Sequence, residues 1–508
     1  MKRSTIIILM LCCAILGALI AIPAVRVADK NKLLASKYED WLKLSVIMQK
    51  IDEMYVDSVD HAKVTDAAVT AALAALDPHS IYMPPQKLEA AQEDLQGNFY
   101  GIGIQFNVPN DTAVVIEVIP GGPAELVGLE PGDRILKVDE TPIAGVRFPQ
   151  DSMVRRMKGP GGTHVTVTVA RGNDTVPFDI VRGRIPTHSV DAAFMVSDTV
   201  GFLRLSKFSR TTAEEFEDAV NYLSSVGMQH LIIDLRDNGG GFLDQALLLS
   251  NCFLPKGKLV VYMEGRHRKR EDFYSDGRGK YQNTGLTLLV SDGTASSGEI
   301  FAGAMQDNGR ARLVGRRTFG KGLVQEPVDF VDGSGVRITV ARFYTPSGRC
   351  IQKPYDTYEE DLINRYENGE MLDADSMKVA KGGIVPDIFV PIDTTRVGRF
   401  YTGCNRKATP MRFSSAFFDA HRTELQKIET YDALMRYLDS AGLEQKFLAY
   451  AASRDGLSPT PEEWKVEKHY MMTQVRALIG RYSKLGDKAF YHIYLDIDDV
   501  FKAAMNAL

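Results

Sequence analysis

The chain has 508 residues, which is too long for one hydrophobic core, so three or four domains are expected. Its formal net charge of −5 excludes the basic balance that is typical of nucleic-acid-binding proteins, so no nucleic-acid partner is expected. Hydrophobic residues make up 44% and charged residues 25% of the chain, as in ordinary globular proteins.

The N-terminus departs from this ordinary composition. Lys2 and Arg3 precede an apolar run over residues 6–25 that contains no charge. This pattern is typical of an exported or anchored chain. A run of about 20 residues can span a bilayer, while residues 21–24 (AIPA) make a poor cleavage site. Residues 1–27 are therefore predicted to be a signal peptide or an inner-membrane anchor, and the protein to be periplasmic or attached to the cell envelope.

The five cysteines argue against a disulfide framework and against a metal site. Cys12 and Cys13 lie inside the apolar run, and only Cys252, Cys350 and Cys404 lie beyond it. Their odd count and wide spacing fit neither a set of bridges nor a metal pattern. We interpret them as core or incidental cysteines, with one disulfide left open. No metal and no organic cofactor is expected.

Residues 28–96 are predicted to be helical. Apolar residues recur near helical spacing between Trp41 and Ile51. A second helix is predicted over residues 65–76, and the Asp77-Pro78 pair ends it. His79 follows this pair, where a lone histidine more often caps or packs than catalyses.

Residues 97–184 contain short β-type runs and two short helical runs. Strands are predicted at 100–104, 114–118, 132–138 and 165–169, and helices at 121–128 and 151–157. This order resembles a PDZ domain. The resemblance implies that a terminal carboxylate of a peptide binds to backbone N–H groups of one loop, while the peptide adds as a strand to an exposed edge. That loop is Tyr100, Gly101, Ile102, Gly103 and Ile104. The alternatives are a groove filled by the protein itself or a domain that serves only as a hinge.

Residues 185–395 alternate between β and α patterns, which predicts an α/β layer fold. A buried strand at 230–235 runs directly into the glycine loop 236–241, and a helix follows from Leu243. Such a loop presents backbone donors at the end of a parallel sheet. A phosphate site is not favoured, because neither GxGxxG nor a Walker lysine is present.

The stretch from Leu286 to Gln325 is predicted to carry the chemistry. A buried strand at 286–290 is followed by a polar turn and by a helix that opens near Ser296. N–H groups at a helix start lack intrahelical partners, so they can stabilise an oxyanion beside this serine. The placement follows the logic of a nucleophile elbow without its GxSxG signature. The alternative is that Ser296 is only a helix cap.

Lys321 is the candidate base, since this stretch contains no histidine. It lies 25 residues after Ser296, between two glycines. A lysine accepts a proton from a serine only when it is neutral, which burial favours. Phe319 and Leu323 can supply apolar surroundings, and Gln325 can hydrogen-bond the amine.

The segments TASSGEI and FGKGLVQ, at this interval, resemble those of the C-terminal processing peptidases, or tail-specific proteases, which use a Ser-Lys dyad. The resemblance implies that Ser296 is the nucleophile, Lys321 the general base and Gln325 the residue that supports the lysine. The usual family run is SASE, whereas this chain has Ser296-Ser297-Gly298-Glu299. Ser297 is therefore an alternative nucleophile, although the interval to Lys321 favours Ser296.

Other segments extend this resemblance over roughly residues 40–392. The glycine loop is similar to a family run, DLRxNxGG, which implies that the amide of Gly240 is one oxyanion donor and that of Ser297 the other. Residues 76–80 (LDPHS) are similar to a segment that precedes the PDZ domain and is structural in the family. Residues 382–387 (GGIVPD) close the resemblance.

Residues 396–508 contain charged helical patterns and no motif. Packing on the core, formation of a homo-oligomer and restriction of access to the site all remain open.

These observations predict a multidomain α/β protein. Its parts are a signal peptide or anchor (1–27), a helical region (28–96), a PDZ domain (97–184), an α/β serine peptidase core (185–395) and a C-terminal helical domain (396–508). The predicted function is an exported serine endopeptidase acting on proteins or peptides with free C-termini. The alternatives are an inactive PDZ-bearing scaffold and an esterase or amidase for small acyl substrates.

Overall fold

The computed structural model describes residues 41–508 except 109–110, 173, 357, 359, 374–381 and 394. The predicted signal peptide or anchor, residues 1–27, lies outside the described residues. Contacts divide the chain into Met1–Ala75 and Leu76–Leu508. The described part of the first unit contains a helix over residues 41–54 and α2 (His61–Ala74). Among the residues described, no helix is long and apolar enough to cross a membrane.

A short strand, β1 (Ile81–Met83), lies a few residues after the start of the second unit, and α3 (Pro85–Gln96) follows it in the chain. β1 interrupts the region that was predicted to be wholly helical. It forms because residues 81–83 pair with β18 (Gly335–Tyr344), more than 250 positions away. A partner this distant leaves no local signal in three residues.

The predicted PDZ segment forms an antiparallel sheet in the order β3-β4-β5-β7-β8. Its strands are β3 (Ile104–Asn107), β4 (Ala113–Val118), β5 (Arg134–Val138), β7 (His164–Arg171) and β8 (Asp174–Val181), and β6 (Thr141–Pro142) pairs with β5. Helices α4 (Pro123–Leu126) and α5 (Gln150–Met157) occupy the two predicted positions. Alternate residues of β7 point inward, as expected for a sheet with one buried face. β2 (Asn98–Gly101) pairs with β9 (Gly183–Pro186) where the domain meets the rest of the unit.

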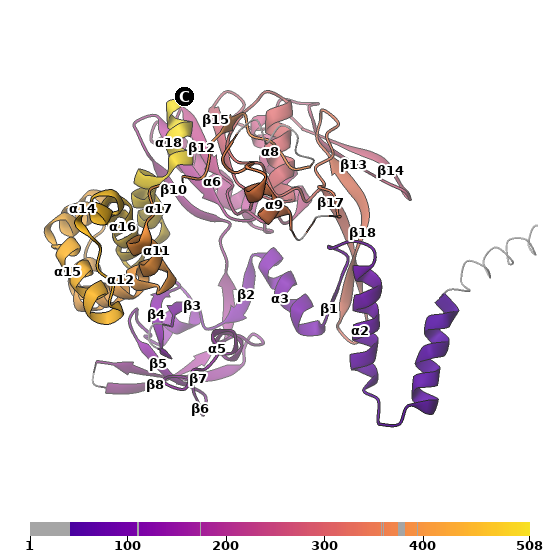
Figure 1. Ribbon diagram of the computed structural model, residues 1–508, viewed down its shortest axis with the longest axis horizontal. Helices are drawn as coiled ribbons and strands as arrows, with labels where there is room; N and C mark the ends of the chain where they lie inside the picture. The colour runs from indigo at the N-terminus through magenta and orange to yellow at the C-terminus, as the bar shows by residue number, and fades with distance from the viewer. Residues whose placement is uncertain are drawn as a thin grey trace, which may run out of the picture. The chain divides into compact units, whose positions relative to one another are not determined.

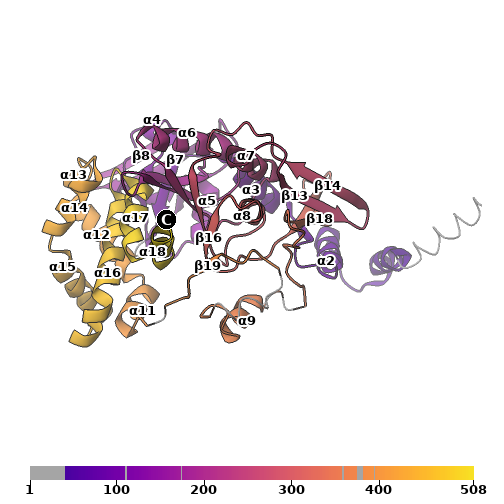
Figure 2. The same ribbon diagram turned by 90° about the horizontal axis from the view of Figure 1, so that it is seen from above.

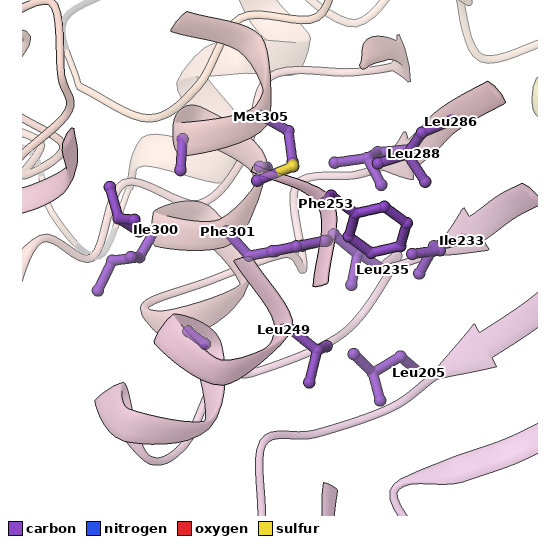
Figure 3. Close-up of a cluster of buried hydrophobic side chains, with 14 of the residues drawn as sticks. Leu205, Ile233, Leu235, Leu249, Phe253, Leu286, Leu288, Ile300, Phe301 and Met305 are labelled. Atoms are coloured by element: carbon purple, nitrogen blue, oxygen red, sulfur yellow. The ribbon is translucent and has the colours of Figure 1, made fainter. Parts of the chain in front are cut away.

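The α/β core is built on a six-stranded sheet in the order β10-β11-β12-β15-β16-β19 (Figure 1). The strands are β10 (Val190–Met195), β11 (Val200–Leu205), β12 (His230–Asp234), β15 (Gly285–Val290), β16 (Arg312–Gly315) and β19 (Ile388–Phe389). All pair in parallel except β10, which is an antiparallel edge. One face is covered by α6 (Thr212–Ser225), α7 (Leu243–Phe253) and α8 (Ser297–Asp307). Figure 3 shows Phe253 and Phe301 from these helices packed against Leu288 from β15 and Leu235, which directly follows β12.

The C-terminal region covers the opposite face of this sheet. Phe202, Ile232 and Leu289 alternate with the strand residues of the first face and pack against Val500 and Ala504. The latter two lie on α18 (Asp499–Asn506), which contacts β15 and β16; Figure 2 shows it beside β16. Coverage on both faces explains why the parallel strands are nearly continuous apolar runs.

The rest of the C-terminal region forms its own helical core around Phe413, Phe417 and Phe447. It consists of α11 (Arg399–Arg406), α12 (Thr409–Ala420), α13 (Arg422–Leu425), α14 (Tyr431–Ser440), α15 (Leu443–Tyr450), α16 (Pro461–Tyr482) and α17 (Gly486–Tyr494). The sequence left three functions open for this region, and one of them, packing on the core, is seen in the contacts that α18 makes with the sheet.

A second sheet, in the order β1-β18-β13-β14 with β17 also on β18, completes the core. Its further strands are β13 (Leu259–Gly265), β14 (Arg268–Tyr274) and β17 (Leu323–Asp329). Cys252, Cys350 and Cys404 are all free, so the disulfide left open by the sequence does not form.

Candidate active site

Ser296 is the N-cap residue of α8, directly after the turn that follows β15. The turn is fixed by Thr294, whose hydroxyl accepts from Ser291 N–H (3.0 Å) and donates to the carbonyl of Leu235 (2.8 Å). Ser296 has φ 53° and ψ −118°, a backbone conformation that costs on the order of 1–3 kcal/mol in a non-glycine residue. The strand-turn-helix prediction is confirmed, with a strained serine where the helix begins.

The two adjacent serines differ in their surroundings. The Ser297 side chain is buried, and its hydroxyl donates to the carbonyl of Gly241 at 2.8 Å. Ser296 is half-buried and forms a capping box with Glu299. The hydroxyl that is open to an incoming group is therefore that of Ser296, and the same residue also caps α8.

The glycine loop after β12 contacts Ser296 directly. Gly240 has φ +92°, and a Cβ at this position would lie 2.6 Å from Ser296 Cβ, so only glycine fits. Its N–H donates to Asn238 Oδ1 at 2.8 Å. Within the described residues, the N–H of Ser297 has no acceptor. Of the two predicted oxyanion donors, the N–H of Ser297 is thus open, whereas the N–H of Gly240 is hydrogen-bonded to the side chain of Asn238 in the same loop.

Glu299 joins the serine helix to the lysine loop. Its carboxylate is fully buried and accepts four hydrogen bonds. Oε2 accepts from the N–H groups of Ser296 (2.9 Å) and Lys321 (2.8 Å), while Oε1 accepts from Gly320 N–H (2.7 Å) and the hydroxyl of Thr318 (2.5 Å). Burial raises the pKa of Glu299, and these donors oppose the rise. The sequence prediction missed this function, although a glutamate that directly precedes the apolar run 300–305 of a helix was a signal for it.

Lys321 is half-buried in the site. Burial lowers the pKa of its amine, the charge of Arg337 lowers it further, and the charge of Glu299 acts in the opposite direction. Within the described part of the chain, no hydrogen bond joins Lys321 Nζ to Ser296 Oγ or to Gln325. The structure therefore connects the backbone of Lys321 to the backbone of Ser296 through Glu299, and among the described residues it does not connect the lysine amine to the serine hydroxyl.

Gln325 lies on β17 and bonds to a different residue from the one expected. Its Nε2 donates to the backbone carbonyl of His79 at 2.5 Å. The glutamine thus connects the strand after the lysine to the segment before β1.

The PDZ loop presents a second group of open amides. The carbonyls of Ile102 and Gly103 accept from Ala124 and Ile119, respectively, whereas their N–H groups have no acceptor among the described residues. Gly103 has φ +79°, and β3, which begins at Ile104, is an edge strand. Tyr100 is 45% exposed and Ile102 is buried. Gly101, also buried, pairs with Gly183.

No cluster of three or more His, Cys, Asp or Glu side chains suited to a metal ion occurs in the described ranges.

Three parts of the chain match known family models. Residues 199–363 match peptidase family S41, residues 90–170 match the PDZ domain, and residues 400–483 match a family of unknown function (DUF8443). The first match includes Ser296, Lys321 and Gln325.

The chain is also similar to curated and solved proteins. It is 31% identical over 354 residues to a probable CtpA-like serine protease of Staphylococcus saprophyticus, which covers 69% of this chain and 71% of the relative. It is 34% identical over 311 residues to a probable CtpA-like serine protease of Staphylococcus aureus (strain N315), covering 61% of this chain and only 62% of the relative's length. Among solved structures, the photosystem II D1 C-terminal processing protease is 27% identical, with a TM-score of 0.38, over 69% of this chain and 86% of that one.

The identity to the Staphylococcus saprophyticus relative and the family match around Ser296 and Lys321 together confirm the family that the sequence motifs indicated: the chain belongs to peptidase family S41.

Proposed function

We propose that this protein is an exported serine endopeptidase that binds the C-terminus of a substrate through its PDZ domain and cleaves upstream of it with a Ser296-Lys321 dyad. The observation that carries the proposal is the buried carboxylate of Glu299, which holds the backbone N–H groups of both dyad residues. A carboxylate in this position fixes the serine and the base in one site before substrate arrives.

In the proposed mechanism, Ser296 Oγ attacks the peptide carbonyl while neutral Lys321 accepts the proton of the serine hydroxyl. The step requires Lys321 Nζ to come within about 3 Å of Oγ. Ser297 N–H stabilises the oxyanion, and Gly240 N–H joins it once the carbonyl oxygen displaces Asn238 Oδ1. Each donor contributes on the order of 3 kcal/mol. Lys321 then protonates the leaving amine, and water hydrolyses the acyl-enzyme by the reverse sequence. Gln325 is proposed to support the lysine from β17.

Substrate capture is proposed to occur at the PDZ loop. The open N–H groups of Ile102 and Gly103 suit a terminal carboxylate, and the free edge of β3 suits an added strand of peptide. The proposed partners are therefore proteins and peptides with free C-termini. We also propose export to the periplasm or cell envelope with the N-terminal segment as signal or anchor, a proposal supported by Lys2 and Arg3 ahead of the uncharged apolar run 6–25.

The test compares the full-length protein with Ser296→Ala and Ser297→Ala. Each is incubated with an unstructured protein that carries a free apolar C-terminus, and with the same protein amidated at its C-terminus. Cleavage by wild type and Ser297→Ala only, weakened by amidation, supports both the nucleophile and the function of the PDZ domain. Cleavage by Ser296→Ala contradicts the proposed nucleophile. Binding without cleavage by wild type supports the scaffold alternative, and turnover of short esters alone supports the small-substrate hydrolase.

A further inference from the structure

His79, which follows the Asp77-Pro78 pair, is held against the core by a rigid turn. Asp77 Oδ1 accepts from the N–H groups of His79 and Ser80, both at 2.8 Å, and Oδ2 accepts from the hydroxyl of Ser80 at 2.6 Å. Ser80 Oγ in turn accepts from the N–H of Thr339 on β18 at 3.1 Å. The backbone of His79 is therefore fixed relative to the sheet that carries β17 and β18.

From this position His79 makes two contacts toward the lysine side of the site. Its carbonyl accepts from Gln325, as described above. Its ring Nε2 is hydrogen-bonded to the hydroxyl of Tyr358, and the two rings meet edge to face with centroids 5.0 Å apart. The histidine is thus held by its backbone and by its side chain.

Tyr358 belongs to an aromatic cluster behind the lysine loop. Its ring also meets Phe319, two residues before Lys321, edge to face at 5.9 Å. Lys353 Nζ lies 4.1 Å from the Phe319 ring and 4.2 Å from the Tyr358 ring, and is paired with Asp361 at 3.0 Å. These contacts connect His79, through Tyr358, to Phe319 in the segment that directly precedes Lys321.

We propose that His79 is a positioning residue for Lys321: its imidazole, held edge-on by Tyr358, excludes water from the side of the base that faces residues 76–80, while its carbonyl fixes Gln325. The inference rests on the proposed function of Lys321 as general base. This function goes beyond the capping or packing that is expected of a lone histidine at this position.

The charges around the two groups agree with this geometry. Burial and then the charge of Lys321 lower the pKa of His79 to about 4, so its ring is neutral at neutral pH; Asp77 opposes this shift and Lys353 adds to it. The groups that act on Lys321 itself are Arg337 from β18, which lowers its pKa, and Glu299 from α8, which raises it.

The sign of the expected effect follows from the charge on lysine. Lys321 acts as a base when neutral, so activity rises as the pH passes upward through its pKa. Water admitted beside the amine stabilises the charged form and raises that pKa. The acid limb of kcat/KM then moves to higher pH.

The experiment measures kcat/KM against pH for the full-length protein and for His79→Ala, His79→Phe and Tyr358→Phe. His79→Ala is expected to move the acid limb up by about one pH unit, which is about a tenfold loss of kcat/KM on that limb. His79→Phe restores a ring and is expected to return the limb most of the way. Tyr358→Phe keeps its ring but releases the imidazole, so a smaller upward shift is expected. His267→Ala, at an exposed turn between β13 and β14, is the matched control and leaves the profile unchanged.

An acid limb in His79→Ala that coincides with the wild-type limb overturns the inference, as does an equal loss at every pH. If His79→Ala fails to fold, Tyr358→Phe decides in the same way: an upward shift supports the inference and an unchanged limb overturns it. Ser296→Ala separates this result from the proposed function. Activity retained in Ser296→Ala contradicts the function itself, whereas an inactive Ser296→Ala with unshifted His79 variants contradicts only the positioning.

Discussion

The start of α8 and the PDZ loop use the same device in two different ways. Among the described residues, the N–H of Ser297 is open beside Gly240 at the start of α8, and the N–H groups of Ile102 and Gly103 are open in the PDZ loop; both Gly240 and Gly103 have positive φ. At α8 the surroundings are locked, because the buried carboxylate of Glu299 takes four donors and Gly240 touches Ser296. At the PDZ loop an edge strand lies open. We infer from the comparison that open backbone N–H groups in rigid surroundings suit the proposed covalent reaction, whereas the same groups beside a free strand edge suit the proposed reversible binding of a peptide.

Glu299→Ala is expected to have the largest effect on this comparison, because it would unlock the α8 site. It leaves four buried donors without an acceptor, and each costs about 1–3 kcal/mol. We expect a strong fall in the denaturation midpoint and loss of measurable peptidase activity. Urea unfolding and cleavage of an unstructured protein check this, with Glu214→Gln, an exposed glutamate in the first turn of α6, as the control. Wild-type stability in Glu299→Ala would contradict the function we give to the carboxylate.

Gly240→Ala is expected to lower kcat by about a hundredfold or more, in line with the loss of an oxyanion donor. The added Cβ would lie 2.6 Å from Ser296 Cβ and would displace the serine or the loop. Gly128→Ala is the matched control, since Gly128 has φ +84° with nothing within 4 Å of an added Cβ. That variant carries the backbone strain without the clash, so equal kcat values in the two variants would refute the steric argument.

Gly103→Ala should weaken capture at the PDZ loop and leave the chemistry intact. Alanine at φ +79° costs on the order of 1 kcal/mol, and its Cβ would lie 3.0 Å from Ile185 Cδ1. We expect KM for substrates with a free C-terminus to rise about fivefold to tenfold with kcat unchanged. Gly121→Ala, at φ +72° with open space, is the control. An equal rise in KM for the amidated substrate would show that the loop does not read the carboxylate.

Arg337→Gln is expected to produce the smallest effect. Removing this cation removes an influence that lowers the pKa of Lys321, so that pKa rises and the acid limb of kcat/KM moves to higher pH, by less than about one unit. Arg342→Gln, an exposed arginine on the same strand, serves as the comparison and should leave the limb in place. A shift to lower pH would show that the sign assigned to Arg337 is wrong.

Local patterns in the sequence were sufficient to predict most elements near the site. The buried strand before Ser296, the polar turn and the helix start all arise from residues within about twenty positions of one another. In the PDZ segment both helices lie where they were predicted, but the strand expected at 100–104 is divided between β2 and β3, and β8 was not predicted. Periodicity and helix-start signals report such short-range structure well. The family motifs also predicted one site that contains Ser296 and Lys321, and membership of peptidase family S41 is confirmed.

The connections between these elements depended on tertiary structure. The bonds from Glu299 to the lysine loop, the bond from Gln325 to His79 and the pairing of β1 with β18 join residues separated by 19 to 256 positions in the chain. The bond from Gly240 to Asn238 is local, but it depends on a loop conformation that sequence spacing does not specify. The sequence by itself determined the local elements and the motifs from which Ser296 and Lys321 are predicted to carry the chemistry, because helix, strand and motif signals are short-range. Only the packing of distant segments decided which side chain holds the serine to the base, because a buried polar group bonds to whatever donors the fold brings to it.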